Sequence, residues 1–348
     1  MVKRVLTKSK ILPVKKMGSK DEKIHSILVY VGGDLIGDAL MKLPFLRALR
    51  NAYPKAHISW CAGKHKSTFA EELAPLVTGM IDVVMEKVGF DKPFKFFYRR
   101  PLYAQKFDLV IDTQRGFFST ILVKRIRHKI FVSGTANFFF SDIKPTQPYI
   151  RPPLMIHQML DLLEIASGKA PIPGYELVLP DTEKYLASKI LPKGPLYIGL
   201  APGAGDLKKC WPIENFIEVA KNQLKLGRKP VFILGPKELP SLAKLRHAVP
   251  DALYPTVDSN KSFKPTVSFS IALGQRLAVA VANDSGAGHI LALADIKLIS
   301  LFGPTSPDKF APAANKSEII KAQNYGEAQM KDIPIEAVIE AINALLKN

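Results

Sequence analysis

Residues 26–50 read SILVYVGGDLIGDALMKLPFLRALR, an apolar run followed by a glycine-rich turn and an amphipathic segment. The β-branched and aromatic residues of Ser26–Val31 favour a buried strand. The spacing of the leucines that follow predicts a helix over Asp38–Asn51. Pro44 is expected in the first turns of that helix, where a proline is tolerated. A strand that enters a helix through glycines is a building unit of parallel α/β sheets.

The same alternation of strands and helices continues along the chain and favours a parallel sheet with helices on both faces. In the first half, strands are predicted at His57–Cys61, Met80–Met85, Phe107–Asp112 and Lys129–Val132, and helices at Thr68–Leu76, Phe118–Arg127 and Ile156–Ser167. In the second half, strands are predicted at Pro195–Ala201, Pro230–Leu234, Leu277–Ala282 and Lys297–Leu301, and helices at Ile213–Leu226, Ser241–His247, Ser268–Gly274, Gly286–Leu293 and Ile335–Leu346.

Pro171, Pro173 and Gly174 punctuate the middle of the chain and mark a linker. We therefore predict a basic tail at 1–23, an N-terminal domain at 24–172 and a C-terminal domain at 173–348. Each domain is expected to be Rossmann-like and doubly wound, with the two facing each other across a cleft. Ligands of such sheets bind at the carboxyl ends of the strands.

The composition fits a soluble two-domain protein. The chain has 348 residues, 47% of them hydrophobic, which is enough for two cores. No apolar run is long enough to span a bilayer, and no secretory signal is evident. Cys61 and Cys210 lie far apart without metal-ligand spacing, so a reducing, cytoplasmic setting is expected.

The formal net charge of +18 indicates an anionic partner, such as a phosphorylated glycan, an acidic lipid or nucleic acid. Basic residues are concentrated in the first half of the chain, although each cluster can also be read as an ordinary solvated surface. The tail 1–23 is predicted to contact membrane phosphate. The basic clusters of the first half are Lys3–Lys23, then Lys92, Lys95, Arg99, Arg100 and Lys106, then Lys124, Arg125, Arg127 and Lys129.

The glycine-rich turn Gly32–Asp38 follows the first strand. It lacks the spacing of the dinucleotide fingerprint, so a nicotinamide cofactor is not predicted. Asp38 at a helix start is a candidate general base, because the helix N-terminus favours its ionised form. From the residues alone, a plain helix-capping role for Asp38 is equally favoured. Asp34 is the alternative base.

Three further loops predict an anion-binding pocket in the second half. The first combines the small residues of Ala201–Gly205 with the Lys208–Lys209 pair, the second is Asn283–His289 at a helix start, and the third is Phe302–Pro307. Small residues, lysine and free helix-end N–H groups suit phosphate oxygens. There is no P-loop and no dicarboxylate or His/Cys cluster, so we expect neither that type of ATP hydrolysis nor a metal site.

Four motifs in order resemble glycosyltransferase family 9, the heptosyltransferases. The first motif is Ile27-Leu28-Val29 with Gly37-Asp38, Leu43-Pro44, Leu46–Leu49 and Tyr53-Pro54. The second is Pro202-Gly203-Ala204 with Lys209-x-Trp211-Pro212. The third is Asn283–Gly286 with His289, and the fourth is Leu301–Thr305. The resemblance covers residue 24 to the C-terminus. It implies the GT-B architecture, no active-site metal and inverting transfer of heptose from ADP-heptose to the lipopolysaccharide core.

The resemblance also implies roles for single residues. Asp38 matches the family's general base, and Lys209 matches the lysine that contacts donor phosphate. The donor-binding turn corresponds to Asp284, Ser285, Gly286 and His289. Glu238 stands where the family places an acidic residue near the donor sugar or ribose. The family's acceptor-binding segment corresponds to Lys92, Lys95, Arg99 and Arg100. Asp112-Thr113-Gln114 resembles the family's Asp-x-Gln, and Asp112 can equally be structural.

The sequence departs from the family at Gly288, where a bulkier residue is usual, in the Gly203–Asp206 loop and in the basic tail.

From the resemblance and the net charge, the expected partners are a nucleotide sugar and an anionic glycolipid at the cytoplasmic face of the inner membrane. No nucleic acid is expected as a partner. Two alternatives remain open: the same fold with another nucleotide sugar for a different surface glycan, and a non-catalytic relic that binds anionic lipid or nucleotide.

Overall fold

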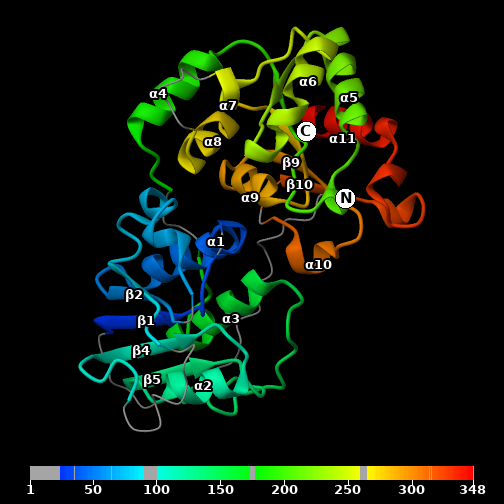
Figure 1. Cartoon of the computed structure of the whole chain (residues 1–348). Helices are drawn as coiled ribbons and strands as arrows, with labels where there is room; N and C mark the ends of the chain where they lie inside the picture. The colour runs from blue at the N-terminus through cyan, green and yellow to red at the C-terminus, as the bar shows by residue number, and fades with distance from the viewer. Residues whose placement is uncertain are drawn as a thin grey trace. The chain divides into compact units, whose positions relative to one another are not determined.

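The computed structural model describes residues 24–34, 36–63, 65–89, 100–172, 177–258, 265–312, 314 and 316–347. The described chain divides into two compact units, one ending at Val178 and the other starting at Leu179 (Figure 1). The boundary expected at residues 172 and 173 stays a prediction. The basic tail 1–23 lies outside the described residues.

The N-terminal unit is a five-stranded parallel sheet in the order β3-β2-β1-β4-β5. The strand order reverses between β1 and β4, and α1 packs on α3, while α2 lies against β5. Its strands are β1 (Ser26–Tyr30), β2 (His57–Ala62), β3 (Val83–Glu86), β4 (Lys106–Asp112) and β5 (Arg127–Ser133). Its helices are α1 (Ile36–Ala52), α2 (Phe117–Lys124) and α3 (Met155–Ser167), with short 3₁₀ helices at Thr68–Ala70 and Ala74–Val77.

Two expectations for this unit are wrong. The predicted helix over Thr68–Leu76 is two separate 3₁₀ helices, because Pro75 lacks an N–H group and begins a new turn. Pro44 lies in the middle of α1 instead of its first turns. The neighbouring Leu43, Phe45 and Leu46 are fully buried, and we attribute the tolerance of an interior proline to this packing.

The C-terminal unit is a second five-stranded parallel sheet, in the order β10-β9-β8-β6-β7. Its strand order reverses between β6 and β8. Its strands are β6 (Tyr197–Ala201), β7 (Lys229–Phe232), β8 (Val279–Asn283), β9 (Lys297–Phe302) and β10 (Lys316–Lys321). Its α-helices are α4 (Asp181–Ile190), α5 (Ile213–Lys225), α6 (Leu242–Ala248), α7 (Pro255–Asp258), α8 (Val267–Gly274), α9 (Gly286–Leu293), α10 (Pro307–Phe310) and α11 (Ile335–Lys347).

Alternate strand residues of this unit face two different helical layers. Leu200, Val281 and Leu301 belong to one core with residues of α5 and α11. On the other face, an added Cβ on Gly199 would meet the Leu277 side chain, and one on Gly274 of α8 would meet Ala294 just after α9. The strands are therefore covered on both sides, as their continuous apolar composition predicts.

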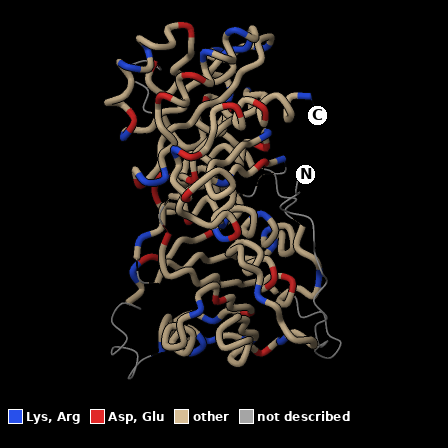
Figure 2. Tube along the Cα trace, turned by 90° about the vertical axis from the view of Figure 1, so that its right-hand side faces the viewer, with Lys and Arg blue, Asp and Glu red and all other residues tan. Residues whose placement is uncertain are grey.

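Figure 2 marks the charged residues along the trace, with Lys and Arg distributed over both units among Asp and Glu. Within the described residues, no helix is both long and apolar enough to cross a membrane.

Candidate active site

The carboxyl ends of β6 and β8 meet where the strand order of the C-terminal sheet reverses. Asn283, the last residue of β8, joins the loops there. Its side-chain amide nitrogen donates to the Pro202 carbonyl at 2.7 Å, and its side-chain amide oxygen accepts from the backbone N–H of Trp211 at 3.2 Å. Asn283 is fully buried, so these bonds are shielded from water. Open α/β sheets bind their ligands at such reversal points.

Lys209 and Asp284 bring three of the sequence motifs together. The Lys209 Nζ lies 2.8 Å from Asp284 Oδ2, and the Thr305 hydroxyl donates to the same oxygen at 2.7 Å. The Asp284 side chain is 6% exposed, whereas that of Lys209 is 29% exposed. The carboxylate therefore orients an ammonium that solvent, or a ligand, can still reach.

Helix α9 begins beside this pair. Ser285 is its N-cap and accepts from the Gly288 N–H at 3.5 Å. A Cβ on Gly286 would meet open space, whereas a Cβ on Gly288 would lie 3.2 Å from the Asn283 carbonyl oxygen. The first turn of α9 thus presents an unobstructed backbone at Gly286, which suits an approaching anion.

His289 lies in the first turns of α9 and is 8% exposed. Burial lowers its pKa to about 4; the Asp284 charge acts against this shift, and the Lys209 charge adds to it. The imidazole is therefore neutral near pH 7, when it has one hydrogen-bond donor and one acceptor.

Glu238 lies on the 3₁₀ helix Pro236–Ser241 and accepts from the Gly235 N–H at 2.8 Å. Its carboxylate packs against Gly203, because a Cβ added there would lie only 2.4 Å from Glu238 Cδ. The predicted donor residues Lys209, Glu238, Asp284, Ser285, Gly286 and His289 therefore all belong to contiguous loops at the carboxyl edge of one sheet.

In the N-terminal unit the two candidate bases differ sharply. Asp34 is 4% exposed; it forms an ion pair with Lys42 and accepts from Trp60 Nε1 at 2.8 Å and from the Ser67 hydroxyl at 3.0 Å. Asp38 is exposed in the first turn of α1, inside the helix and not at its cap. Within the described chain, Asp38 has no side-chain hydrogen bond or ion pair. The Asp34 carboxylate is thus engaged in structural contacts, and the Asp38 carboxylate is open to solvent.

Asp112 ends β4 and is fully buried. One of its oxygens accepts from the Thr120 hydroxyl at 2.6 Å and the Ser133 hydroxyl at 3.0 Å, and the other accepts from the Gln114 N–H at 2.9 Å. Burial raises its pKa to about 6, against the opposing effect of these bonds. This network favours the structural interpretation of Asp112.

A small hollow that is partly open to solvent is lined by Asp112, together with Gln114 and Gly134 and with residues of α3. Arg115 lines it and donates to the Gly134 carbonyl at 3.4 Å. Burial and the like charge of Arg151 lower the pKa of Arg115, while Tyr149 and Asp161 oppose this. Sequence reasoning missed Arg115; its place just after a strand end was the available signal.

The predicted acceptor residues are only partly covered by the structure. Lys92, Lys95 and Arg99 lie outside the described residues, and Arg100 is exposed. Their proposed role therefore stays a prediction.

A family model for glycosyltransferase family 9 (heptosyltransferase) matches residues 96–337. The chain belongs to this family. Lipooligosaccharide heptosyltransferase 2 of Haemophilus influenzae is 23% identical over 355 residues, covering 92% of this chain and 99% of that protein. Lipopolysaccharide heptosyltransferase 2 of Salmonella typhimurium is 27% identical over 171 residues, covering 43% of this chain and 46% of that protein.

Solved structures show the fold of this family 9 glycosyltransferase. The family 9 glycosyl transferase of Veillonella parvula superposes with a TM-score of 0.72 at 21% identity, covering 95% of this chain and 99% of that one. Escherichia coli ADP-heptose lipopolysaccharide heptosyltransferase II superposes with a TM-score of 0.64 at 20% identity, covering 93% of this chain and 99% of that one. The predicted GT-B fold class, with two Rossmann-like units, is confirmed.

Within the described residues, no group of three or more His, Cys, Asp or Glu side chains is arranged to hold a metal ion.

Proposed function

We propose that this family 9 glycosyltransferase transfers heptose from ADP-heptose to an anionic glycolipid such as the lipopolysaccharide inner core. The observation that carries the proposal is the Lys209–Asp284–Thr305 cluster at the start of α9. The names of relatives that align over most of the chain support heptose as the sugar.

The donor diphosphate is assigned to the C-terminal unit. Lys209 offers a partly exposed ammonium, and the first turn of α9 offers unobstructed N–H groups at Gly286. As the bond between the anomeric carbon and the diphosphate breaks, negative charge grows on the leaving phosphate. A fixed lysine and helix-end dipoles stabilise that charge without reorganising. Asp284 keeps the lysine in place, and Glu238 is assigned to the donor sugar or ribose.

Asp38 is assigned as the general base. It takes the proton of the acceptor hydroxyl while that oxygen attacks the anomeric carbon from the face opposite the diphosphate, which inverts the configuration. Its exposure in the first turn of α1 leaves its carboxylate free to meet an acceptor. Asp34 is not assigned this role because three donors and burial already engage its carboxylate.

The acceptor is assigned to the N-terminal unit. Arg115 and Asp112 both line the hollow, and the Arg115 guanidinium can bind carboxylate or phosphate in a bidentate fashion. Lys92, Lys95, Arg99 and Arg100 are proposed to bind the acceptor as well. An anionic glycolipid places the enzyme at the cytoplasmic face of the inner membrane, where the basic tail 1–23 is proposed to contribute contacts.

The test is a calorimetric titration of the full-length protein with ADP, UDP, GDP and NAD, repeated with Lys209→Ala. We expect ADP to bind most tightly and the variant to lose that affinity. Preference for UDP or GDP would retain a transferase but replace the sugar nucleotide. If none of these nucleotides binds, the result would favour a non-catalytic relic that uses no nucleotide-sugar donor.

A further inference from the structure

Four large apolar side chains are exposed together on the N-terminal unit. They come from α2 and from the turn that follows β5, and we call them the aromatic surface: Phe117 (53% exposed), Phe118 (82%), Ile121 (37%) and Phe139 (70%). Phe140 links the two segments, since its ring lies 5.2 Å from Phe117 and 5.1 Å from Phe139. Contiguous exposed apolar patches in soluble units mark interaction sites.

The backbone forces Phe139 outward. Ala136, Asn137 and Phe138 all have left-handed φ angles of 49°, 53° and 64°. This backbone conformation is disfavoured for residues other than glycine, and it is unusual for a bulky side chain such as that of Phe138. Phe138 is buried and packs edge-on to Tyr149 at 4.9 Å. Thus one phenylalanine anchors the turn inside, and the next projects into solvent.

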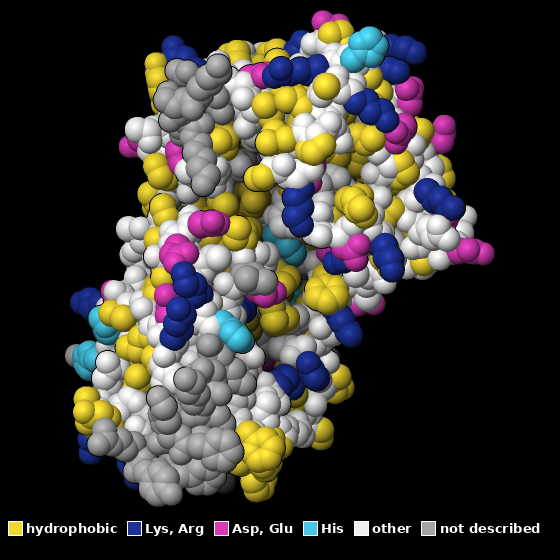
Figure 3. All heavy atoms as spheres, viewed as in Figure 1, with side chains coloured by type: hydrophobic (Ala, Val, Ile, Leu, Met, Phe, Trp, Pro, Cys, Tyr) yellow, Lys and Arg dark blue, Asp and Glu magenta, His cyan; other side chains and the backbone are white. Residues whose placement is uncertain are grey.

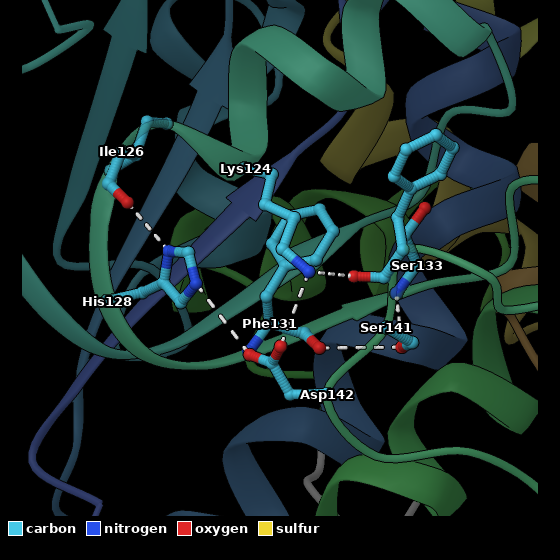
Figure 4. Close-up of polar contacts among 8 residues, drawn as sticks. Lys124, Ile126, His128, Phe131, Ser133, Ser141 and Asp142 are labelled. Atoms are coloured by element: carbon cyan, nitrogen blue, oxygen red, sulfur yellow. Dashed lines mark hydrogen bonds and ion pairs between the residues drawn. The ribbon is translucent and has the colours of Figure 1, made fainter.

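A polar clamp holds this turn against β5 and α2 (Figure 4). Asp142 accepts from the Phe131 N–H at 2.8 Å, and the Ser141 hydroxyl accepts from the Ser133 N–H at 3.0 Å. Lys124 of α2 donates to the Phe140 carbonyl and lies 3.4 Å from Asp142. The exposed aromatic side chains therefore stand on a fixed scaffold.

Basic residues lie in or next to the chain segments that carry the aromatic surface. The Lys144 ammonium lies 5.8 Å from the centre of the Phe139 ring, and Lys124 lies at the far end of α2. Arg115 stands two residues before α2, and Arg151 is exposed two residues after Tyr149. Asp142 is the acid in this clamp, and Lys124 neutralises it. Apolar side chains are visible at the lower end of the N-terminal unit in Figure 3, with Lys and Arg on the same face.

We propose that the aromatic surface docks this unit onto an anionic lipid bilayer. Aromatic side chains surrounded by lysine and arginine match the two layers of a membrane interface, because the rings enter the acyl boundary while the cations meet lipid phosphate. A second copy of this chain is disfavoured as the occupant, because its net charge of +18 would face these cations with like charge. The purpose of this docking rests on the proposed function. Helix α2 begins two residues after Arg115, so docking through α2 would bring a glycolipid acceptor to the hollow that Arg115 lines.

The test is sedimentation of the full-length protein with vesicles of phosphatidylglycerol and phosphatidylcholine that contain no glycolipid acceptor. The Phe118→Ser, Phe139→Ser double variant is expected to lower the partition coefficient roughly tenfold or more, from the lost apolar burial. Lys144→Glu is expected to weaken binding mainly at low salt. Tyr185→Ser is the matched control, because Tyr185 is 63% exposed with Lys189 over its ring but lies on α4 of the other unit.

A second measurement does not depend on whether the double serine variant folds. Phe139→Trp should show a blue-shifted emission on these vesicles and quenching by lipids labelled in the acyl chain, because both native tryptophans are buried. Wild-type partitioning of the double serine variant, or an indole that stays in water in the Phe139→Trp variant, would overturn the proposal. So would a concentration-dependent dimer that Phe118→Ser dissociates without any vesicle binding. None of these results depends on donor or acceptor, so they leave the transferase assignment intact.

Discussion

The Lys209 ammonium lies 2.8 Å from Asp284 Oδ2, although the two residues are 75 positions apart in the chain. The contact joins the loop after β6 to the loop after β8 across the reversal point of the C-terminal sheet. Because Asp284 is buried and Lys209 is partly exposed, we propose that the carboxylate supports the ammonium and that the ammonium faces the ligand.

Lys209→Ala should weaken ADP binding roughly 10- to 100-fold, the range for one hydrogen bond between charged groups. Asp284→Asn should have a smaller effect, since it leaves the lysine present but loosely held. Lys208 is exposed and lies beside Lys209 on the 3₁₀ helix Leu207–Lys209, so Lys208→Ala serves as the control and should bind ADP normally. Calorimetry measures all three, and equal affinities for Lys209→Ala and wild type would disprove the phosphate contact.

Asp38→Asn should lower kcat by about 10²–10⁴, the usual contribution of a general base, while ADP affinity stays within about twofold. The side chain is exposed and unbonded within the described chain, so the thermal midpoint should be nearly unchanged. Rates from initial velocities and affinity from calorimetry separate the two effects. A variant that turns over normally would remove Asp38 from the mechanism.

Gly203→Ala should impair donor use, because the new Cβ would meet the Glu238 carboxylate at 2.4–2.8 Å and push it aside. Gly205→Ala offers a matched control two residues later, since nothing lies within 4 Å of its added Cβ. We expect the first variant to raise KM for the donor several-fold and the second to leave it unchanged. Identical kinetics for both would mean that the position of Glu238 is irrelevant to the donor.

His289 should make the fold sensitive to acid. Its folded pKa of about 4 lies below the ordinary value of 6.5, so its contribution to stability is present above pH 6.5 and is lost as the pH falls towards 4. Relative to His289→Gln, the wild type should lose on the order of 3 kcal/mol of unfolding free energy between pH 7.5 and 4. Urea titrations at several pH values test this. Parallel pH profiles for the two proteins would contradict a buried neutral imidazole.

Strands next to glycine or proline were predictable because their apolar runs are short and bounded, as in β6 between Pro195 and Pro202 and in β9 before Gly303-Pro304. The chain elements that were missed lack this signal. β10 is a partly exposed strand of sequence KSEIIK, and α4 buries little beyond Glu183 and Ala187. Pro44 was expected near a helix start because local propensity carries no information about the burial that its neighbours gain in α1.

The site was predictable to the extent that its residues follow strand ends. The loops with Lys209 and Asp284 were expected to border one crevice, and the structure adds that the two side chains form an ion pair. The difference between Asp34 and Asp38 was invisible in the sequence, since it depends on Lys42, Trp60 and Ser67 converging on Asp34. The aromatic surface was missed because Phe117 and Phe139 belong to segments that only the fold brings together.

The most direct measurement is transfer itself. Full-length protein is incubated with ADP-heptose and a heptose-deficient lipopolysaccharide core, in parallel with UDP- and GDP-sugars, and the acceptor mass is recorded. We predict that the acceptor gains one heptose only with the ADP donor, that ADP is released in equal amount, and that Lys209→Ala and Asp38→Asn strongly reduce the rate of both. Transfer from a UDP- or GDP-sugar alone, or no transfer from any donor while ADP still binds, would contradict the proposed heptosyltransferase.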